Sequence, residues 1–220
     1  MKAGCIVNAA DPGQIIILNG APRSGKSSIV KVVLDTFDGV WINLGVDCFK
    51  QQTSQRYSPG IGLRPGGELS TTIEPLVPVL YAAMYESIAA HSRLGVNVVV
   101  DVGHHDAYAE PRGILFASAR RLSGLPVLFV GVRCPVDVIV ERRQKTWDPS
   151  RGLDEHIQRW QREVHIPGIY DIEVDTSRCS PQECAGKIRQ FLEERPRLSA
   201  LAQLAEMQPD NGNPVCEAAK

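Results

Sequence analysis

The sequence has no apolar run that approaches the roughly 18 residues needed for a helix to span a bilayer. No continuous apolar stretch follows the first residues, because Asn8, Asp11 and Pro12 interrupt it, so no signal peptide is expected. The six cysteines form no C-x-x-C pair and are too sparse for a disulfide framework. These absences predict a reduced, cytoplasmic protein with no membrane partner.

An excess of positive charge is also missing. The 24 basic and 25 acidic residues give a formal net charge of -1, which supplies no field to gather a nucleic-acid backbone. Apolar residues make up 43% and charged residues 22% of the 220 positions, close to globular averages, and the length suits one domain. Nucleic acid is therefore not an expected partner, whereas a homo-oligomer is left open.

Short apolar runs recur along the chain. Residues 15–19 form one that is closed by Gly20 and is typical of a strand buried on both faces of a parallel sheet. The other expected strands are 40–46, 96–100, 126–132 and 172–174, and the expected crossover helices are 26–37, 75–94, 111–123, 135–146, 153–164 and 181–194. The alternation predicts the α/β class, as a three-layer α/β/α P-loop NTPase fold with a five-stranded parallel sheet.

Several helix starts carry signals of their own. Pro111 and Pro135 stand where a first helical residue tolerates proline, and Ser180 with Glu183 forms a capping-box pattern around Pro181. We expect one kinase domain at 1–194, with a substrate-binding insert near 49–74 and a lid near 142–152. The extension at 195–220 is expected to hold a short helix and a frayed, partly flexible end without a catalytic role.

The motif that carries chemistry is a complete P-loop pattern at residues 20–27. Its glycines let backbone amides turn around an anion, Lys26 can reach the β and γ phosphates, and the Ser27 hydroxyl can bind Mg²⁺. The match follows a buried strand and opens a helix, whose N-terminus favours phosphate. ATP and Mg²⁺ are therefore the expected cofactors. The expected nucleotide-binding residues are Gly20, Ala21, Pro22, Arg23, Ser24, Gly25, Lys26, Ser27 and Ser28.

Two aspartates follow expected strands at the edge where such folds bind ligands. Asp47 closes the second strand and could accept the proton of an acceptor hydroxyl or orient that hydroxyl. Asp101 closes the third strand, where a Walker-B aspartate would hold Mg²⁺. Aspartate also caps helices and stabilises turns, so a structural role for either residue remains the alternative.

Residues 141–152 concentrate basic side chains at a helix end and in the loop that follows. Arg142 and Arg151 are the candidates to reach the transferring phosphoryl group from a lid, although cations also favour a helix C-terminus through the macrodipole. His104, His105 and Asp106 follow Asp101, but adjacent residues seldom converge on one metal ion. His104 is instead expected to line the substrate site.

Together, these elements resemble the chloramphenicol phosphotransferase family of P-loop kinases. The similarity is carried by the Ile-Leu-Asn before the P-loop, the Gly-Val-Asp ending at Asp47, the Gly-Val-Arg-Cys ending at Cys134, and residues 170–176. The resemblance implies an ATP-dependent O-phosphotransferase that uses Mg²⁺ and confers antibiotic resistance, with Asp47 as catalytic base and Asp101 as the aspartate after the third strand. The spacing between Arg142 and Arg151 departs from the family pattern.

Residues 51–72 depart most from the family, and they include the candidate substrate residues Arg56, Tyr57 and Arg64. Two arginines there favour an anionic or phosphate-bearing acceptor over neutral chloramphenicol, because guanidinium groups suit such anions. Two alternatives stay open. One is another small-molecule, nucleotide or sugar-nucleotide kinase on the same fold, and the other is a nucleotide-binding module that regulates a partner without catalysis.

Overall fold

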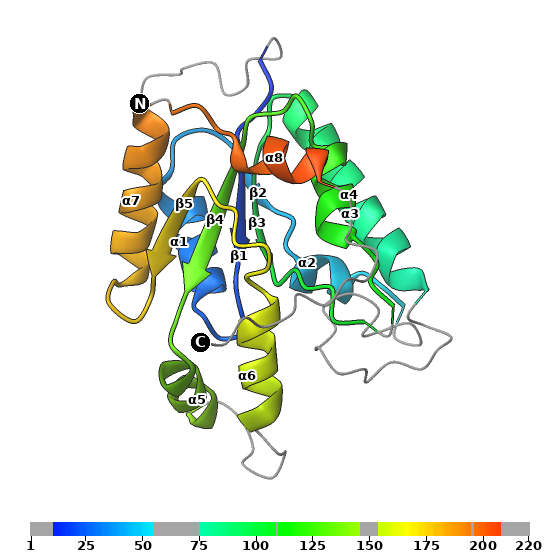
Figure 1. Ribbon diagram of the computed structural model, residues 1–220. Coiled ribbons are helices and arrows are strands. Elements are labelled where there is room, and N and C mark those ends of the chain that lie inside the picture. Colours follow the sequence, from blue (N-terminus) through cyan, green and yellow to red (C-terminus); the bar gives the residue numbers. More distant parts are fainter. Residues whose placement is uncertain (1–10, 55–74, 109, 146–153, 195, 208–220) are drawn as a thin grey trace, which may run out of the picture.

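Five parallel strands form the central sheet, in the order β2-β3-β1-β4-β5. The computed structural model describes residues 11–54, 75–108, 110–145, 154–194 and 196–207. Because all strands run the same way, their carboxyl ends share one edge, at the lower end of the sheet in Figure 1. The strand bounds are β1 Ile15–Asn19, β2 Trp41–Asn43, β3 Asn97–Val102, β4 Val127–Arg133 and β5 Ile172–Asp175.

Helices cover both faces of this sheet, as predicted from the sequence (Figure 1). One face packs against α1 and α7 and the other against α3, α4 and α8, while α5 and α6 lie beyond the carboxyl edge. The bounds are α1 Lys26–Thr36, α2 Val46–Gln51, α3 Leu76–Arg93, α4 Ile114–Arg121, α5 Val136–Gln144, α6 Asp154–Glu163, α7 Pro181–Glu193 and α8 Ala200–Glu206. The expected three-layer α/β/α architecture with a five-stranded parallel sheet is confirmed.

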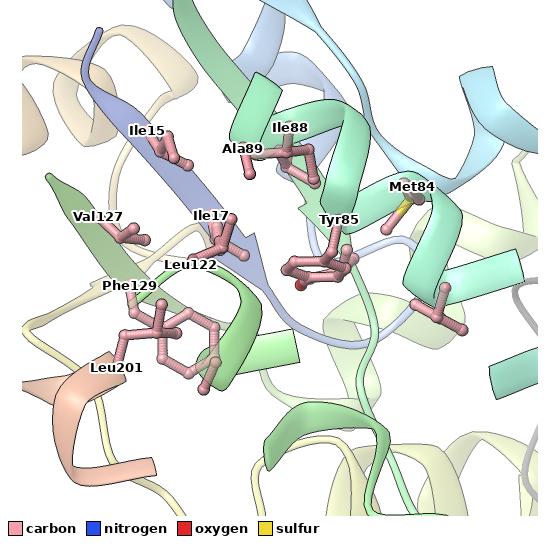
Figure 2. Packing of buried hydrophobic residues seen from close by; sticks show 14 of the residues in the cluster. Ile15, Ile17, Met84, Tyr85, Ile88, Ala89, Leu122, Val127, Phe129 and Leu201 are labelled. Carbon is pink, nitrogen blue, oxygen red and sulfur yellow. The ribbon is translucent and has the colours of Figure 1, made fainter. Parts of the chain in front are cut away.

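The apolar run of β1 explains its central place. All five of its residues are buried, and successive side chains point to opposite faces of the sheet. Ile15 and Ile17 join the cluster under α3, α4 and α8, whereas Ile16 and Leu18 join the cluster under α1 and α7. Figure 2 shows the first cluster, in which Phe129 of β4 lies among side chains of β1 and the covering helices.

The start of α7 follows the predicted capping box. The Glu183 N–H donates to Ser180 Oγ at 3.2 Å, and the Ser180 N–H donates to Glu183 Oε2 at 2.7 Å. The expected first-turn proline, Pro181, begins the helix. Reciprocal capping of this kind satisfies two backbone donors that a helix start otherwise leaves free.

The C-terminal helix α8 belongs to the core. Leu201 and Leu204 are buried in the cluster shown in Figure 2, and burying each leucine side chain contributes about 1.5–3 kcal/mol. The Asp171 carboxylate accepts the N–H groups of Ser199 and Ala200 at 2.9 and 3.0 Å, and so caps a helix that has no side-chain cap of its own. Part of the expected extension therefore completes the domain.

The main local corrections concern the second strand and the fourth helix. The expected strand 40–46 is wrong at its end, because β2 stops at Asn43 and the chain turns at Gly45 into α2, a helix that the sequence pattern did not reveal. Pro111 does not begin α4, which starts at Ile114 after Gly113 in a left-handed conformation with φ 58°. Within the described residues, every helix is too short or too polar to cross a membrane.

Candidate functional site

The phosphate loop joins β1 to α1 at the centre of the carboxyl edge. Arg23 and Gly25 both have positive φ, of 68° and 90°, which turns the loop sharply before the helix starts. No side chain caps the first turn of α1, so its N–H groups remain available to an anion. Gly20 has no space for a side chain, because a Cβ there would lie 2.5 Å from the Val132 carbonyl oxygen.

Lys26 lies folded over this loop. Its ammonium donates to the carbonyl oxygens of Gly20 and Ala21, each at 2.8 Å. Although the residue as a whole keeps some solvent exposure, burial of the ammonium lowers its pKa to about 8, against the opposing effect of the Asp101 and Asp47 carboxylates. An anion bound in the loop would raise that pKa, because it favours the charged form of the amine.

The two residues predicted to bind magnesium are in direct contact. The Ser27 hydroxyl donates to Asp101 Oδ2 at 2.7 Å, and Asp101 lies inside β3, directly opposite Leu18 of β1. A hydroxyl and a carboxylate are the hard oxygen ligands that Mg²⁺ takes in nucleotide-binding proteins, usually one or two from the protein with water and phosphate completing the shell. The residues present therefore fit this ion.

Gly45 holds the Asp101 carboxylate from the other side. A Cβ at position 45 would overlap Asp101 Oδ1, so the turn before α2 accepts only glycine at this approach. The Gly45 N–H donates to Asn43 Oδ1 at 2.8 Å, which fixes the turn against the end of β2. The close packing against Asp101 thus explains why glycine begins the Gly-Val-Asp sequence.

Asp47 lies in the first turn of α2 and not at a strand end, which corrects the expected placement. Asp47 is an exposed residue. Burial and, after it, the Asp47 charge raise the pKa of Tyr81 in α3, and the same charge opposes the burial that lowers the pKa of Lys26. The carboxylate is therefore within electrostatic range of both the phosphate loop and the buried face of α3. Beside it, burial first, then Asp101 and Asp47, raise the pKa of the Cys48 thiol, so this thiol remains protonated at neutral pH.

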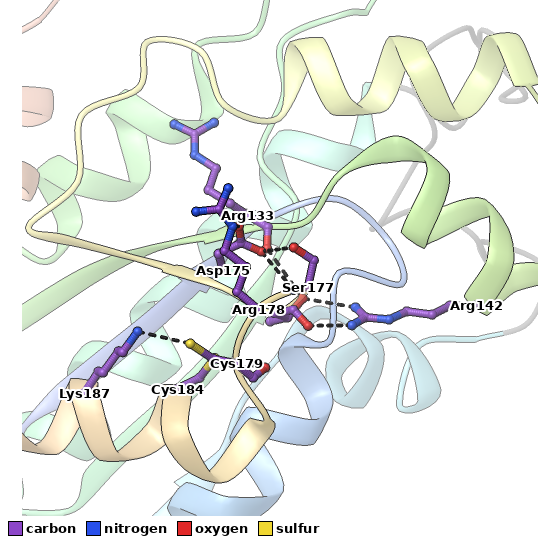
Figure 3. A network of polar contacts seen from close by, with 9 residues as sticks. Arg133, Arg142, Asp175, Ser177, Arg178, Cys179, Cys184 and Lys187 are labelled. Atoms are coloured by element: carbon purple, nitrogen blue, oxygen red, sulfur yellow. Dashed lines mark hydrogen bonds and ion pairs between the residues drawn. The ribbon is translucent and has the colours of Figure 1, made fainter.

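Arg142 connects α5 to the phosphate loop (Figure 3). Its guanidinium donates to the Thr176 hydroxyl at 3.0 Å and to the Thr176 carbonyl at 2.6 Å. The Thr176 hydroxyl in turn donates to the Ser24 carbonyl oxygen at 2.7 Å. The arginine predicted for the lid thus contacts the loop after β5, which itself packs against Gly25 of the phosphate loop.

A buried asparagine at the end of β1 joins four segments. Asn19 Oδ1 accepts the His104 N–H at 2.8 Å, so its amide nitrogen is the donor to the Val164 carbonyl at 2.8 Å and to Tyr170 Oη at 2.9 Å. Tyr170 Oη also shares a hydrogen bond of 2.8 Å with His165 Nδ1, which brings the turn after α6 into the same network.

His104 lies beneath this network. Its ring is only 2% exposed and hydrogen-bonds through Nε2 to Tyr85 Oη at 2.6 Å, with the Tyr81 ring centred 5.3 Å away. Burial, and to a smaller extent the neighbouring His105, lowers the pKa of His104 to about 3. The ring is neutral at physiological pH, and its described contacts are with α3.

The sequence comparison decides the family. Residues 13–193 match the family described as chloramphenicol phosphotransferase-like protein. The chain belongs to this family. It is therefore a kinase-type phosphotransferase with a P-loop that binds nucleotide, and the resemblance found in the sequence is confirmed.

Related proteins agree with this family assignment. The "Putative O-phosphotransferase Rv2636" of Mycobacterium tuberculosis strain H37Rv is 25% identical over 206 residues, which cover 87% of this chain and 88% of that protein. Among solved structures, a sugar kinase from Janibacter sp. HTCC2649 superposes with a TM-score of 0.58 at 17% identity, over 83% of this chain and 95% of the other. Shikimate kinase from Aquifex aeolicus gives 0.51 at 20% identity, over 82% and 97%. These structures share the fold.

The structure brings together part of the predicted set in this phosphotransferase. The carboxyl edge brings together Lys26, Ser27 and Asp101. The negative charge of Asp47 acts on Lys26, and Arg142 contacts the same loop from α5. Pro22, Arg23 and Ser28 are exposed loop and helix residues, and Ser24 is buried. The remaining predicted residues, Arg56, Tyr57, Arg64 and Arg151, lie outside the described residues.

Sequence reasoning missed two residues whose hydrogen bonds hold the phosphate loop in place, Asn19 and Thr176, and it missed Trp160, which packs in one cluster with Ala21 of that loop. Asn19 precedes the P-loop and Thr176 follows β5, so both positions border the ligand edge of the sheet, which is the signal that could have drawn attention to them. Trp160 lies in α6, and no local pattern separates it from an ordinary core tryptophan.

Proposed function

We propose that this protein transfers the γ-phosphoryl group of ATP to a hydroxyl group of a small molecule. The observation that carries the proposal is the convergence of Lys26, Ser27 and Asp101 at one point, within range of the Asp47 charge. A structural lysine or serine would not need a carboxylate pair at the same sheet edge. The arrangement instead matches what phosphoryl transfer requires, namely positioned charge around the phosphates and a base beside the acceptor.

Each residue has a role in that reaction. Lys26 and the N–H groups of the loop bind the β and γ phosphates, and Lys26 offsets the negative charge that spreads over the transferring group. Ser27 and Asp101 would hold Mg²⁺, which when bound neutralises phosphate charge. Asp47 orients the acceptor hydroxyl and takes its proton as the bond from the acceptor oxygen to the γ-phosphorus forms and the bond to the ADP oxygen breaks.

Arg142 serves this site by position. Its bonds to Thr176 and to the Arg23 carbonyl hold α5 against the phosphate loop. The resulting link supports the nucleotide side of the site. Contact of Arg142 and Arg151 with the transferring phosphoryl group, from a lid, stays a proposal. For the acceptor, Arg56 and Arg64 continue to favour an anionic alcohol over neutral chloramphenicol. Phosphorylation of chloramphenicol itself would instead make this an antibiotic-resistance enzyme.

The test is an acceptor screen with γ-labelled ATP and Mg²⁺, over neutral alcohols including chloramphenicol and over anionic alcohols such as sugar phosphates and nucleotides. Asp47→Asn should lower turnover of the best acceptor by about 10²- to 10⁴-fold while ATP affinity stays near that of the parent. Asp35→Asn, at an exposed position of α1, is the matched control. Full turnover in Asp47→Asn would reject Asp47 as the base, and nucleotide binding without any labelled product would favour a regulatory module.

A further inference from the structure

Unpaired polar atoms gather at one junction of this protein. Apart from arginine nitrogens, the buried side-chain atoms without a hydrogen-bond partner in the described part of the chain are Ser24 Oγ, Trp160 Nε1, Gln161 Oε1 and His165 Nε2. One belongs to the phosphate loop, and the other three belong to α6 and the turn after it. Buried polar groups normally have hydrogen-bond partners, so such a concentration indicates that these atoms gain partners in another state of the protein.

Trp160 occupies the middle of this junction. Its indole is 6% exposed and packs with Ala21 of the phosphate loop, with Cys134, which follows β4, and with Ile139 of α5. On its other side the ring edge lies against the loop after β3, where a Cβ on Gly103 would be 2.9 Å from the ring and 3.2 Å from the Gly20 carbonyl oxygen. The indole therefore packs against both the phosphate loop and the loop that follows Asp101, and these two loops also meet directly through the 3.2 Å hydrogen bond from the Gly20 N–H to the Val102 carbonyl.

The same ring also contacts the side chains after β3. His105 meets Trp160 edge to face, with centroids 4.9 Å apart, and stacks on Tyr108 at 4.7 Å. A shift of Trp160 would thus be transmitted both to the nucleotide side, through Ala21, and to the loop after Asp101, through His105. The indole has one N–H donor that needs a partner when it is buried, whereas a phenyl ring in the same place would have no donor.

We propose that Trp160 is a positioning residue that repacks when nucleotide binds, so that its indole N–H gains an acceptor and the phosphate loop and the loop after Asp101, which both pack against it, are held in their working arrangement. This inference rests on the proposed nucleotide-dependent function and goes beyond it by assigning α6 a role in assembling the site. The N–H that costs stability in the free protein then contributes to binding in the complex.

Fluorescence tests the movement directly. Trp41→Phe combined with Trp147→Phe leaves Trp160 as the single tryptophan of the three. Adding a non-hydrolysable ATP analogue with Mg²⁺ should change its emission maximum and its quenching by acrylamide, with the concentration dependence that calorimetry gives for binding. Unchanged emission at saturating analogue would overturn the proposal. If calorimetry shows no binding to the unsubstituted protein, the proposed function fails first, and this inference fails with it.

The N–H itself is tested by replacing Trp160 with 3-benzothienylalanine, which keeps the shape of the indole and has sulfur in place of the N–H. Affinity for the analogue should fall about three- to tenfold, the value of one uncharged hydrogen bond, while the thermal midpoint of the free protein does not fall. Trp41 is the matched control, since its indole N–H already donates to the Asp38 carbonyl at 3.0 Å. The same replacement there should lower the midpoint and leave affinity unchanged, and unaltered affinity in the Trp160 variant would reduce this residue to packing.

Discussion

The phosphate side and the acceptor side of the sheet edge are held in different ways. The phosphate side, meaning residues 19–27 with Asp101 and Thr176, is fixed by buried and partly buried hydrogen bonds, including those of Asn19 and Lys26. The acceptor side, meaning Asn43 to the end of α2, has Asp47 on an exposed turn, and the described side-chain hydrogen bonds there are those of Asn43 to Gly45 and Cys48. The residues around the phosphates, which every kinase of this fold must bind, are thus held firmly. The residues around the acceptor, which differs between substrates, are held by fewer bonds.

The largest expected effect comes from the phosphate side. Lys26→Ala removes a cation from the phosphates themselves, so both ATP affinity and turnover should fall, with turnover lower by about 10³-fold or more. Lys31→Ala, an exposed lysine of the same helix, should change neither. Steady-state kinetics and calorimetry measure the two quantities. Near-normal affinity and turnover in Lys26→Ala would refute the assignment of the phosphate side.

Acid should weaken the protein through the histidines that lie beneath the phosphate side. Burial holds the pKa of His104 at about 3 and of His165 at about 4, below the ordinary 6.5, so the unfolded chain takes up these protons first as pH falls. Stability is therefore unaffected by them above about pH 6.5 and is lost as pH drops from there toward 4, by about 1.4 kcal/mol per pH unit for each histidine.

Urea unfolding at pH 7.0, 6.0, 5.0 and 4.5 measures that loss. His104→Gln should flatten the decline relative to the parent by about 2 kcal/mol across this range. His91→Gln, near the end of α3, controls for the removal of a histidine as such. An identical decline in the parent and in His104→Gln would show that His104 is not a source of the acid sensitivity.

Two asparagines offer a direct comparison of the sides. Asn19→Ala leaves the His104 N–H, the Val164 carbonyl and the Tyr170 hydroxyl without their shared partner, and should lower the free energy of unfolding by about 2–4 kcal/mol. Asn43→Ala, on the acceptor side, should cost about 1 kcal/mol, because its partners lie in a partly exposed turn. Urea unfolding measures both losses. An equal loss of free energy of unfolding in the two variants would show that the two sides are held equally firmly.

The smallest expected effect concerns Cys48. Cys48→Ala removes a protonated, partly buried thiol whose contact with the Asn43 amide is 3.3 Å long. Stability should change by less than about 1 kcal/mol and turnover by less than about threefold. Loss of most activity would instead assign this thiol a part in the reaction.

Local sequence sufficed for features that depend on short-range physics. The buried run of β1, the capping box at Ser180 and the glycine pattern of the phosphate loop each specify their structure within a few residues. Asp101 could be identified as a ligand candidate because it directly follows a local apolar run. The error at the second strand has a local cause as well, because Val46 is apolar and buried whether it ends a strand or begins a helix.

Only the tertiary structure decided which distant residues share a site. Asn19 meets Val164 and Tyr170 across about 150 positions, Thr176 reaches the Ser24 carbonyl across 152, and Trp160 packs against two loops that are not adjacent in the chain. Periodicity and propensity describe a residue's neighbours within one or two turns, whereas these contacts depend on strand order and helix packing. The nucleotide loop could thus be predicted from its own residues, and the network that holds it had to be found in the fold.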